Sequence, residues 1–206
     1  MGTLKFIRAC FKKLQRVWLY LIRKHQFLEY HYSDVIKSPI RITPSFIAMG
    51  ENVHIFYHAR IEGIGSYMGK AYKPSITLKQ GVSIQQNIHL TCANSVVIGE
   101  NTAIAANVTI TDIHHPYTDI DTPIEQQELE VKSVEIGPDC KIYNNAVILP
   151  GTKLGKHVTV GANSVVNGFF PDYCVIVGAP AYIIKRYDNA TGVWRKTDKV
   201  GNFISD

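Results

Sequence analysis

The sequence lacks a cysteine framework, because its four cysteines form no CxxC pair and show no metal-ligand spacing. Neither a disulfide scaffold nor a structural metal site is expected, and Cys10, Cys92, Cys140 and Cys174 are expected to be reduced. No apolar run approaches the roughly 20 residues that cross a bilayer. The most apolar N-terminal stretch, residues 17–22, is too short for a signal-peptide core. We therefore expect a cytoplasmic protein that is not secreted.

Acidic residues are absent from residues 4–24, which hold a large share of the basic residues behind the net charge of +5. Apolar side chains recur in this stretch at helical spacing: Ile7, Cys10, Phe11, Leu14, Val17, Trp18 and Leu21. The pattern predicts a basic amphipathic helix. Such a helix either covers the open first coil of a solenoid or lies on an anionic inner membrane leaflet. Nucleic acid is not an expected partner.

The main positive signal is a period of six residues, which neither an α-helix nor a plain alternating strand explains. Branched or large apolar residues lie six apart in four runs: Met49, Ile55, Ile61; Ile76, Val82, Ile88; Ile98, Ile104, Ile110; and Ile136, Ile142, Ile148, Leu154, Val160, Val166. The fifth place of many hexads is small or β-branched, and the second is often glycine. Each hexad therefore reads as one short strand and one corner.

A solenoid with one hexad on each flat face accounts for this period. Three hexads make one triangular coil, so the runs predict an all-β parallel β-helix of about five coils. Insertions at 62–75, around 92–97 and at 111–135 are expected to leave it as loops. We divide the chain into a helical appendage at 1–40, the β-helix at 41–187 and a C-terminal tail at 188–206, which we expect to form a short helix or an extended segment.

The repeat motif, the segment ITDIHHPYTDIDTPIEQQ at 110–127 and VGAPAYIIKRY at 177–187 together resemble the hexapeptide acyltransferases. Within them the chain looks most like the maltose and galactoside O-acetyltransferase branch, and especially the bacterial O-antigen and capsule O-acetyltransferases. The resemblance implies a left-handed β-helix, a homotrimer with active sites between subunits, and acetyl transfer from acetyl-CoA to a sugar hydroxyl. No metal is expected.

Acetyl transfer to a hydroxyl needs a base with a pKa near neutrality, for which histidine is suited. The longest insertion carries His114 and His115, and resemblance to the family pattern Asp-x-x-His-x-Tyr places the base on His115. Asp112 either holds that imidazole or caps the loop. Because no serine or cysteine lies in a nucleophile motif, direct transfer is expected rather than an acyl-enzyme.

The resemblance also implies residues for both substrates. For the acceptor it indicates Asn87 and Gln85 on the preceding coil, with His114, Tyr117 and Gln127 either beside the same cleft or fixing the loop. For acetyl-CoA it indicates three residues of the last coils, Asn144, Ala162 and Asn167, and the basic pair Lys185 and Arg186. The chain departs from the family at 167–168, where Asn-Gly replaces the usual Thr-Lys.

Other functions remain open at this point. An amino-sugar N-acyltransferase or an antibiotic acetyltransferase would show a similar base and donor site. A zinc lyase resembling γ-type carbonic anhydrases needs three converging imidazoles, which His54, His58, His89, His114 and His115 could supply in number but not in that family's spacing. A non-catalytic scaffold on the same solenoid is the third class.

Overall fold

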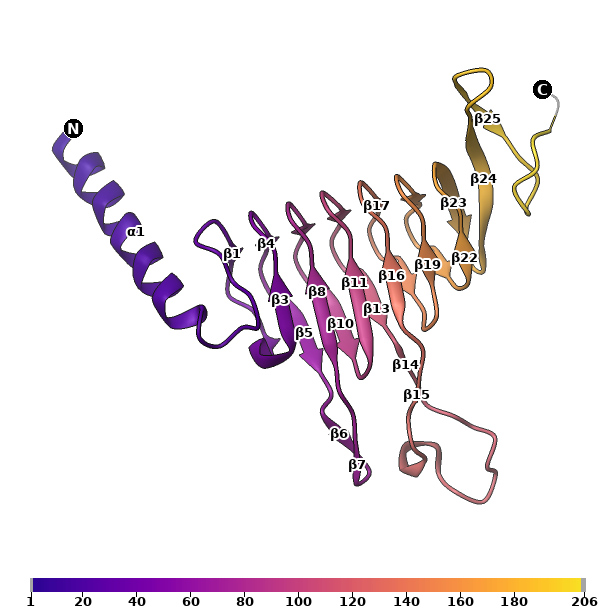
Figure 1. Ribbon diagram of the computed structural model, residues 1–206, viewed down its shortest axis with the longest axis horizontal. Helices are drawn as coiled ribbons and strands as arrows, with labels where there is room; N and C mark the ends of the chain where they lie inside the picture. The colour runs from indigo at the N-terminus through magenta and orange to yellow at the C-terminus, as the bar shows by residue number, and fades with distance from the viewer. Residues whose placement is uncertain (1, 205–206) are drawn as a thin grey trace.

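The computed structural model describes residues 2–204, with side chains at residues 10, 11 and 13–204. Three parallel sheets form the faces of a solenoid that winds left-handed from one end of the molecule to the other (Figure 1). The first face contains β1 (Val35–Ile36), β4 (His54–Ile55), β9 (Ser83–Ile84), β12 (Ala103–Ile104), β17 (Lys141–Ile142), β20 (Thr159–Val160) and β23 (Cys174–Gly178).

The other two faces have six strands each. The second face contains β2 (Arg41–Ile42), β5 (Arg60–Gly63), β10 (His89–Cys92), β13 (Thr109–Thr111), β18 (Val147–Ile148) and β21 (Val165–Val166). The third face contains β3 (Ile47–Met49), β8 (Ser75–Leu78), β11 (Ser95–Ile98), β16 (Val134–Ile136), β19 (Lys153–Leu154) and β22 (Phe169–Phe170). The solenoid therefore has six coils, one more than the hexads suggested. The sequence count left out β1, β2, β22 and also β23, which follows the sixth coil, because Ile42 lies seven residues before Met49 and Phe170 only four after Val166.

The apolar residues of the hexads form the core, as predicted. All fifteen are at most 4% exposed, and the predicted small residues of the fifth place are buried with them. One run has a different register from the one expected: Ile55 pairs with Ile84, so Val82 occupies a fifth place rather than a first. Successive inward positions on a strand are two residues apart, and both columns therefore repeat with a period of six. Periodicity alone could not tell one column from the other.

Two of the three predicted insertions leave the solenoid. Residues 64–72 contain a hairpin of β6 (Ser66–Tyr67) and β7 (Lys70–Ala71), and residues 112–133 form a long loop whose base is the antiparallel pair β14 (Ile113–His114) and β15 (Glu130–Val131). The loop also contains the short 3-10 helix η2 (Ile124–Gln126), and another, η1 (Pro44–Phe46), precedes β3. The insertion expected around 92–97 is wrong. Four-residue strands β10 and β11 absorb the extra length, and only residues 93 and 94 lie between them.

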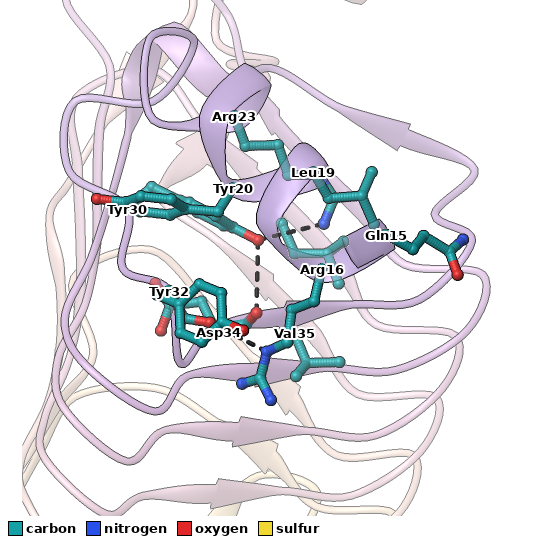
Figure 2. Close-up of a pocket in the computed structure, with 10 residues that line it drawn as sticks. Gln15, Arg16, Leu19, Tyr20, Arg23, Tyr30, Tyr32, Asp34 and Val35 are labelled. Atoms are coloured by element: carbon teal, nitrogen blue, oxygen red, sulfur yellow. Dashed lines mark hydrogen bonds between the residues drawn. The ribbon is translucent and has the colours of Figure 1, made fainter. Parts of the chain in front are cut away.

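The predicted helix is α1 (Gly2–Arg23), which projects from the N-terminal end of the solenoid (Figure 1). Its contacts with the first coil come from its polar side: Arg16 donates to the carbonyls of Tyr32 and Ser33, both at 3.2 Å, and Tyr20 stacks on Tyr30. Figure 2 shows Arg16 and Tyr20 facing this coil across a cavity of about 270 Å³. The helix is therefore attached by its cationic side.

The apolar side of α1 is exposed in the described residues, so this side does not cover the open first coil; Tyr20, on the opposite side of the helix, packs against the core there. Phe11, Leu14 and Trp18 are 71%, 68% and 62% exposed. The buried side chains of Phe27 and Tyr30, which follow the helix, cover the end of the core instead. The side chains of Lys5, Ile7, Arg8 and Lys12, which belong to the predicted amphipathic pattern, lie outside the described residues.

At the other end of the solenoid, β24 (Ala181–Asp188) turns back along β23, and β25 (Val193–Lys196) pairs with β24. The tail is thus an extended hairpin that continues the first face beyond residue 187. Across residues 2–204, no helix combines the length and apolar character needed to cross a bilayer.

Candidate functional site

A cavity of about 390 Å³ lies on the outer side of the second face, beneath the hairpin β6–β7 and the long loop. Strands β5, β10 and β13 supply its floor, because outward-facing residues on neighbouring strands stand beside one another. Its lining residues are Arg60, Ile64, Tyr67, His89, Thr91, Thr109, Thr111, Ile113, His115 and Leu129. The cavity therefore joins three coils of the scaffold to both insertions.

His115 lies in this cavity with one side of its ring enclosed. Its Nδ1 atom is buried and has no hydrogen-bond partner, and the Glu125 Oε2 atom is 3.9 Å away. The Tyr67 ring meets the imidazole edge-on, with 5.5 Å between ring centroids. The side chain as a whole is 36% exposed. An approaching substrate can therefore reach the imidazole while Nδ1 faces the protein.

The hairpin holds the loop that carries His115. The Tyr67 hydroxyl donates to the Glu125 carbonyl at 2.6 Å and lies 3.0 Å from its carboxylate, and Lys70 pairs with Glu128 at 2.6 Å. The Tyr72 hydroxyl accepts a hydrogen bond from the Leu129 amide at 3.0 Å. Partial burial and the Glu125 carboxylate both raise the pKa of Tyr67, so its hydroxyl stays protonated as a donor. These contacts join segments 57 or 58 residues apart in sequence.

Asp112 fixes the base of the loop and makes no hydrogen bond to His115. Its fully buried carboxylate accepts hydrogen bonds from the amides of Ala93, Asn94 and Ser95 at 2.7–2.8 Å. The Cys92 thiol also donates to it, at 3.4 Å. Of the two roles considered for Asp112, the geometry therefore favours the capping role. The capped amides belong to the preceding coil rather than to the loop itself.

His114, the last residue of β14, does not line the cavity that contains His115. It lines a second cavity of about 470 Å³ together with Tyr117, Lys132 and Asn167. The structure thus brings a predicted acceptor residue, Tyr117, next to a predicted acetyl-CoA residue, Asn167. These residues and His115 lie on two sides of one loop.

Asn87 belongs to a ladder of asparagines along the corner between the first and second faces. Asn87 donates to Asn107 at 2.9 Å, Asn107 to Asn145 at 3.1 Å, and Asn145 to Asn163 at 3.1 Å. All four have φ near +60°, a conformation that asparagine tolerates better than most residues. Gln85 lies just before this corner, and neither Gln85 nor Asn87 lines the cavity with His115.

Gln127 braces the loop internally, since its amide donates to the carbonyls of Asp119 and Thr122 at 2.9 and 2.8 Å. The remaining predicted acetyl-CoA residues do not meet at one point. Asn144 and Ala162 lie on adjacent coils at the asparagine corner, where the Asn163 amide donates to the Asn144 carbonyl. Lys185 is exposed on β24, whereas Arg186 donates to the Gly201 carbonyl at 3.2 Å.

Three lining residues, Arg60, Tyr67 and His89, were not assigned to the site from the sequence, and neither was Glu125, which contacts Tyr67 beside the cavity. The pKa of His89 is lowered by burial and by the nearby Arg60 guanidinium, so its imidazole is neutral at pH 7. The sequence could have indicated Arg60 and His89, because each directly precedes a buried residue of the second face and therefore faces outward. Tyr67 and Glu125 had no such signal, because only the fold brings the two insertions together.

The buried cysteines are poor nucleophiles. Burial raises the pKa of Cys92 and of Cys174 to about 12, and that of Cys140 to about 11. Their thiols are therefore protonated near neutral pH. All four cysteines are free. Among the residues that the structure describes, no group of three His, Cys, Asp or Glu side chains is arranged to hold a metal ion.

Comparison with known proteins identifies hexapeptide-repeat transferases and acetyltransferases as similar. A family model described as "Bacterial transferase hexapeptide (six repeats)" matches residues 133–168. WbbJ of Escherichia coli K12, named as an O-acetyl transferase of lipopolysaccharide biosynthesis, is 34% identical over 175 residues, which cover 81% of this chain and 86% of WbbJ. Rv3034c of Mycobacterium tuberculosis, named as an acetyltransferase, is 29% identical over 197 residues, 90% of this chain and 63% of that protein.

The solved structure of a hexapeptide-repeat acetyltransferase, VCA0836 of Vibrio cholerae, has a TM-score of 0.54 with this chain at 19% sequence identity. The match covers 84% of this chain and 82% of that one. At this level of identity the likeness concerns the fold.

The role of Asp112 can be tested by Asp112→Asn. This change keeps the shape of the side chain but replaces one acceptor oxygen with an NH2 group, which cannot accept a hydrogen bond from the backbone amides. We predict a loss of about 2–4 kcal/mol in the free energy of unfolding. This corresponds to a decrease of at least about 4 °C in the thermal midpoint, measured by calorimetry. A variant with an unchanged midpoint but no acetyl transfer would instead assign Asp112 to the chemistry.

Proposed function

The chain belongs to the bacterial hexapeptide-repeat acetyltransferases, and on this premise we propose that it transfers an acetyl group from acetyl-CoA to a sugar hydroxyl in surface-polysaccharide biosynthesis. The observation that carries the proposal is the similarity to WbbJ, which extends over 86% of that protein's length. The cavity supports it, because a half-exposed histidine lies over a floor of hydroxyl side chains from Thr91, Thr109 and Thr111.

In the proposed mechanism His115 is the general base. Its Nε2 atom accepts the proton of the sugar hydroxyl while the oxygen attacks the thioester carbonyl carbon. Collapse of the tetrahedral intermediate breaks the carbon–sulfur bond, and the leaving thiolate receives the proton from His115. Direct transfer is proposed because no serine or cysteine lies in a nucleophile motif, and because an acyl-enzyme on Cys92, Cys140 or Cys174 would need a thiolate that their raised pKa values disfavour.

Glu125 is the proposed positioning residue for this base. Its carboxylate lies 3.9 Å from His115 Nδ1 and is held by the Tyr67 hydroxyl. A small rotation of the exposed Glu125 side chain would let it accept a hydrogen bond from Nδ1–H. That bond would select the tautomer in which Nε2 is free to accept a proton.

Replacing His115 tests the mechanism. We predict that His115→Ala lowers kcat for acetyl transfer to a sugar acceptor by a factor of about 10²–10⁴, which is the usual contribution of a positioned general base. His54→Ala, at an exposed histidine on β4, is the matched control and is expected to keep full activity. Near-normal turnover by His115→Ala, followed as release of the CoA thiol, would refute the assignment.

We propose that acetyl-CoA binds along the last coils, with Asn144, Ala162 and Asn167 toward its pantetheine arm and Lys185 and Arg186 toward its phosphates. The second cavity supports this position, because it places Asn167 and Lys132 beside the loop that carries His115.

We further propose that the protein works as a homotrimer with its active sites between subunits. Large apolar side chains near the loop support this: Tyr117 and Ile120 are 67% and 92% exposed in the single chain. A second subunit packed against the loop would remove this surface from water.

The native mass tests the trimer directly. Sedimentation equilibrium of the full chain at micromolar concentration is expected to give three times the 23.1 kDa of one chain. A single species with the mass of one chain, retained in the presence of acetyl-CoA, would contradict the proposal.

For the cellular location we propose peripheral contact of α1 with an anionic membrane. The exposed side of α1 carries Phe11, Leu14 and Trp18, and the sequence at residues 4–24 holds seven basic residues and no acidic one. Apolar side chains combined with basic ones bind the interface of anionic bilayers. The attachment of α1 by its opposite side leaves this apolar surface free for such contact.

Vesicle sedimentation tests this contact. At low salt, the full chain is expected to bind vesicles of phosphatidylcholine with phosphatidylglycerol, and Leu14→Glu is expected to bind at least about tenfold less tightly. Ile40→Glu is the matched control, because Ile40 is 72% exposed but lies outside the helix. Absence of vesicle binding by the unaltered chain would refute the proposed membrane contact. An equal loss of vesicle affinity in Leu14→Glu and Ile40→Glu would refute it as well.

A further inference from the structure

A buried glutamate on the second face orients two arginines. Glu62, on β5, is only 7% exposed. Its Oε1 atom lies 2.6 Å from Arg41 Nε, and its Oε2 atom lies 2.9 Å from Arg60 Nε and 2.7 Å from an Arg60 terminal nitrogen. The two arginine side chains remain 64% and 43% exposed. A carboxylate is thus enclosed while the two guanidinium groups that it binds face outward.

This arrangement leaves one positive charge in excess at a defined place. Burying a carboxylate is costly unless it is paired and hydrogen-bonded, and here both oxygens are paired. Each guanidinium has five N–H donors in a fixed plane, and Glu62 occupies only some of them. Glu62 thus orients both guanidinium groups while their remaining donors can bind an anion such as phosphate, which arginine binds with two parallel hydrogen bonds.

The paired arginines lie next to the proposed catalytic cavity. In the strand register Arg41 pairs with Arg60, Arg60 with His89 and His89 with Thr109, which places them in one row across neighbouring strands. Arg60 and His89 also line the cavity that contains His115. Since neighbouring strands are about 4.8 Å apart, the row leads from the N-terminal coil to the floor of the cavity that contains His115.

We propose that Arg41 and Arg60 bind a phosphate or diphosphate group of the acceptor, so that the sugar attached to it reaches His115. This inference rests on the proposed acetyl transfer and names the chemical class of its acceptor. Acetyl-CoA also carries phosphates, but the residues proposed for it lie on coils after β13. The arginines lie on the opposite side of His115, toward the N-terminus. The acceptor is therefore the source that the geometry favours.

The test measures binding of inorganic pyrophosphate by calorimetry in the presence of saturating CoA, which occupies the donor site. We expect pyrophosphate to bind the unaltered protein and to bind Arg60→Gln roughly 10- to 100-fold more weakly, with a similar change in Arg41→Gln. Arg195→Gln is the matched control, because Arg195 also pairs with a buried carboxylate, Asp188, at 3.0 Å, but on the C-terminal hairpin. Its pyrophosphate affinity is expected to be unchanged.

Three results would overturn the inference: no binding by the unaltered protein, loss of binding when CoA is added, or pyrophosphate affinities of Arg60→Gln and Arg41→Gln that equal the affinity of the unaltered protein. Glucose 1-phosphate should also bind in preference to glucuronate, and the reverse preference would reject phosphate as the ligand group. Because none of these measurements needs turnover, their failure is distinct from failure of the proposed function. If the unaltered protein transferred acetyl groups to no sugar acceptor, the proposed function itself would be rejected.

Discussion

The position of His115 depends on how the loop at 112–133 is held against the solenoid. At its base, the enclosed carboxylate of Asp112 accepts three backbone hydrogen bonds from the preceding coil. Farther along, Tyr67 and Lys70 of the hairpin bind Glu125 and Glu128. A long insertion would otherwise sample many conformations at a large entropic cost. Attachment at both places gives an otherwise irregular segment one defined orientation over the cavity.

The second face lies beneath this loop and supplies the floor of the cavity that contains His115. Its inward side chains belong to the repeating core, while its outward row changes along the solenoid from Arg41 and Arg60 through His89 to Thr109. The repeat determines the positions of these outward side chains but not their residue types. A solenoid can therefore vary its chemistry from coil to coil while the packing that supports it stays the same.

Much of the fold was predictable because its core follows a local rule. Residues six apart face inward, so the hexads from Met49 to Val166 identified the buried columns, and the gap after Ile110 identified the loop. Contacts between insertions follow no local rule. The pairing of Tyr67 with Glu125 spans 58 residues, and the amides that Asp112 binds belong to another coil. The exposure of the apolar side of α1 likewise depends on which side of the helix packs, which its amphipathic pattern does not specify.

The central claim is that one cavity on the second face brings an acceptor hydroxyl to His115. A crystal structure of the protein with CoA and a phosphorylated sugar acceptor would test it most directly. We predict that the acceptor hydroxyl lies within hydrogen-bonding distance of His115 Nε2, and that the CoA sulfur enters beside the same imidazole from the C-terminal coils. An acceptor bound away from this cavity, with His115 touching neither substrate, would contradict the account.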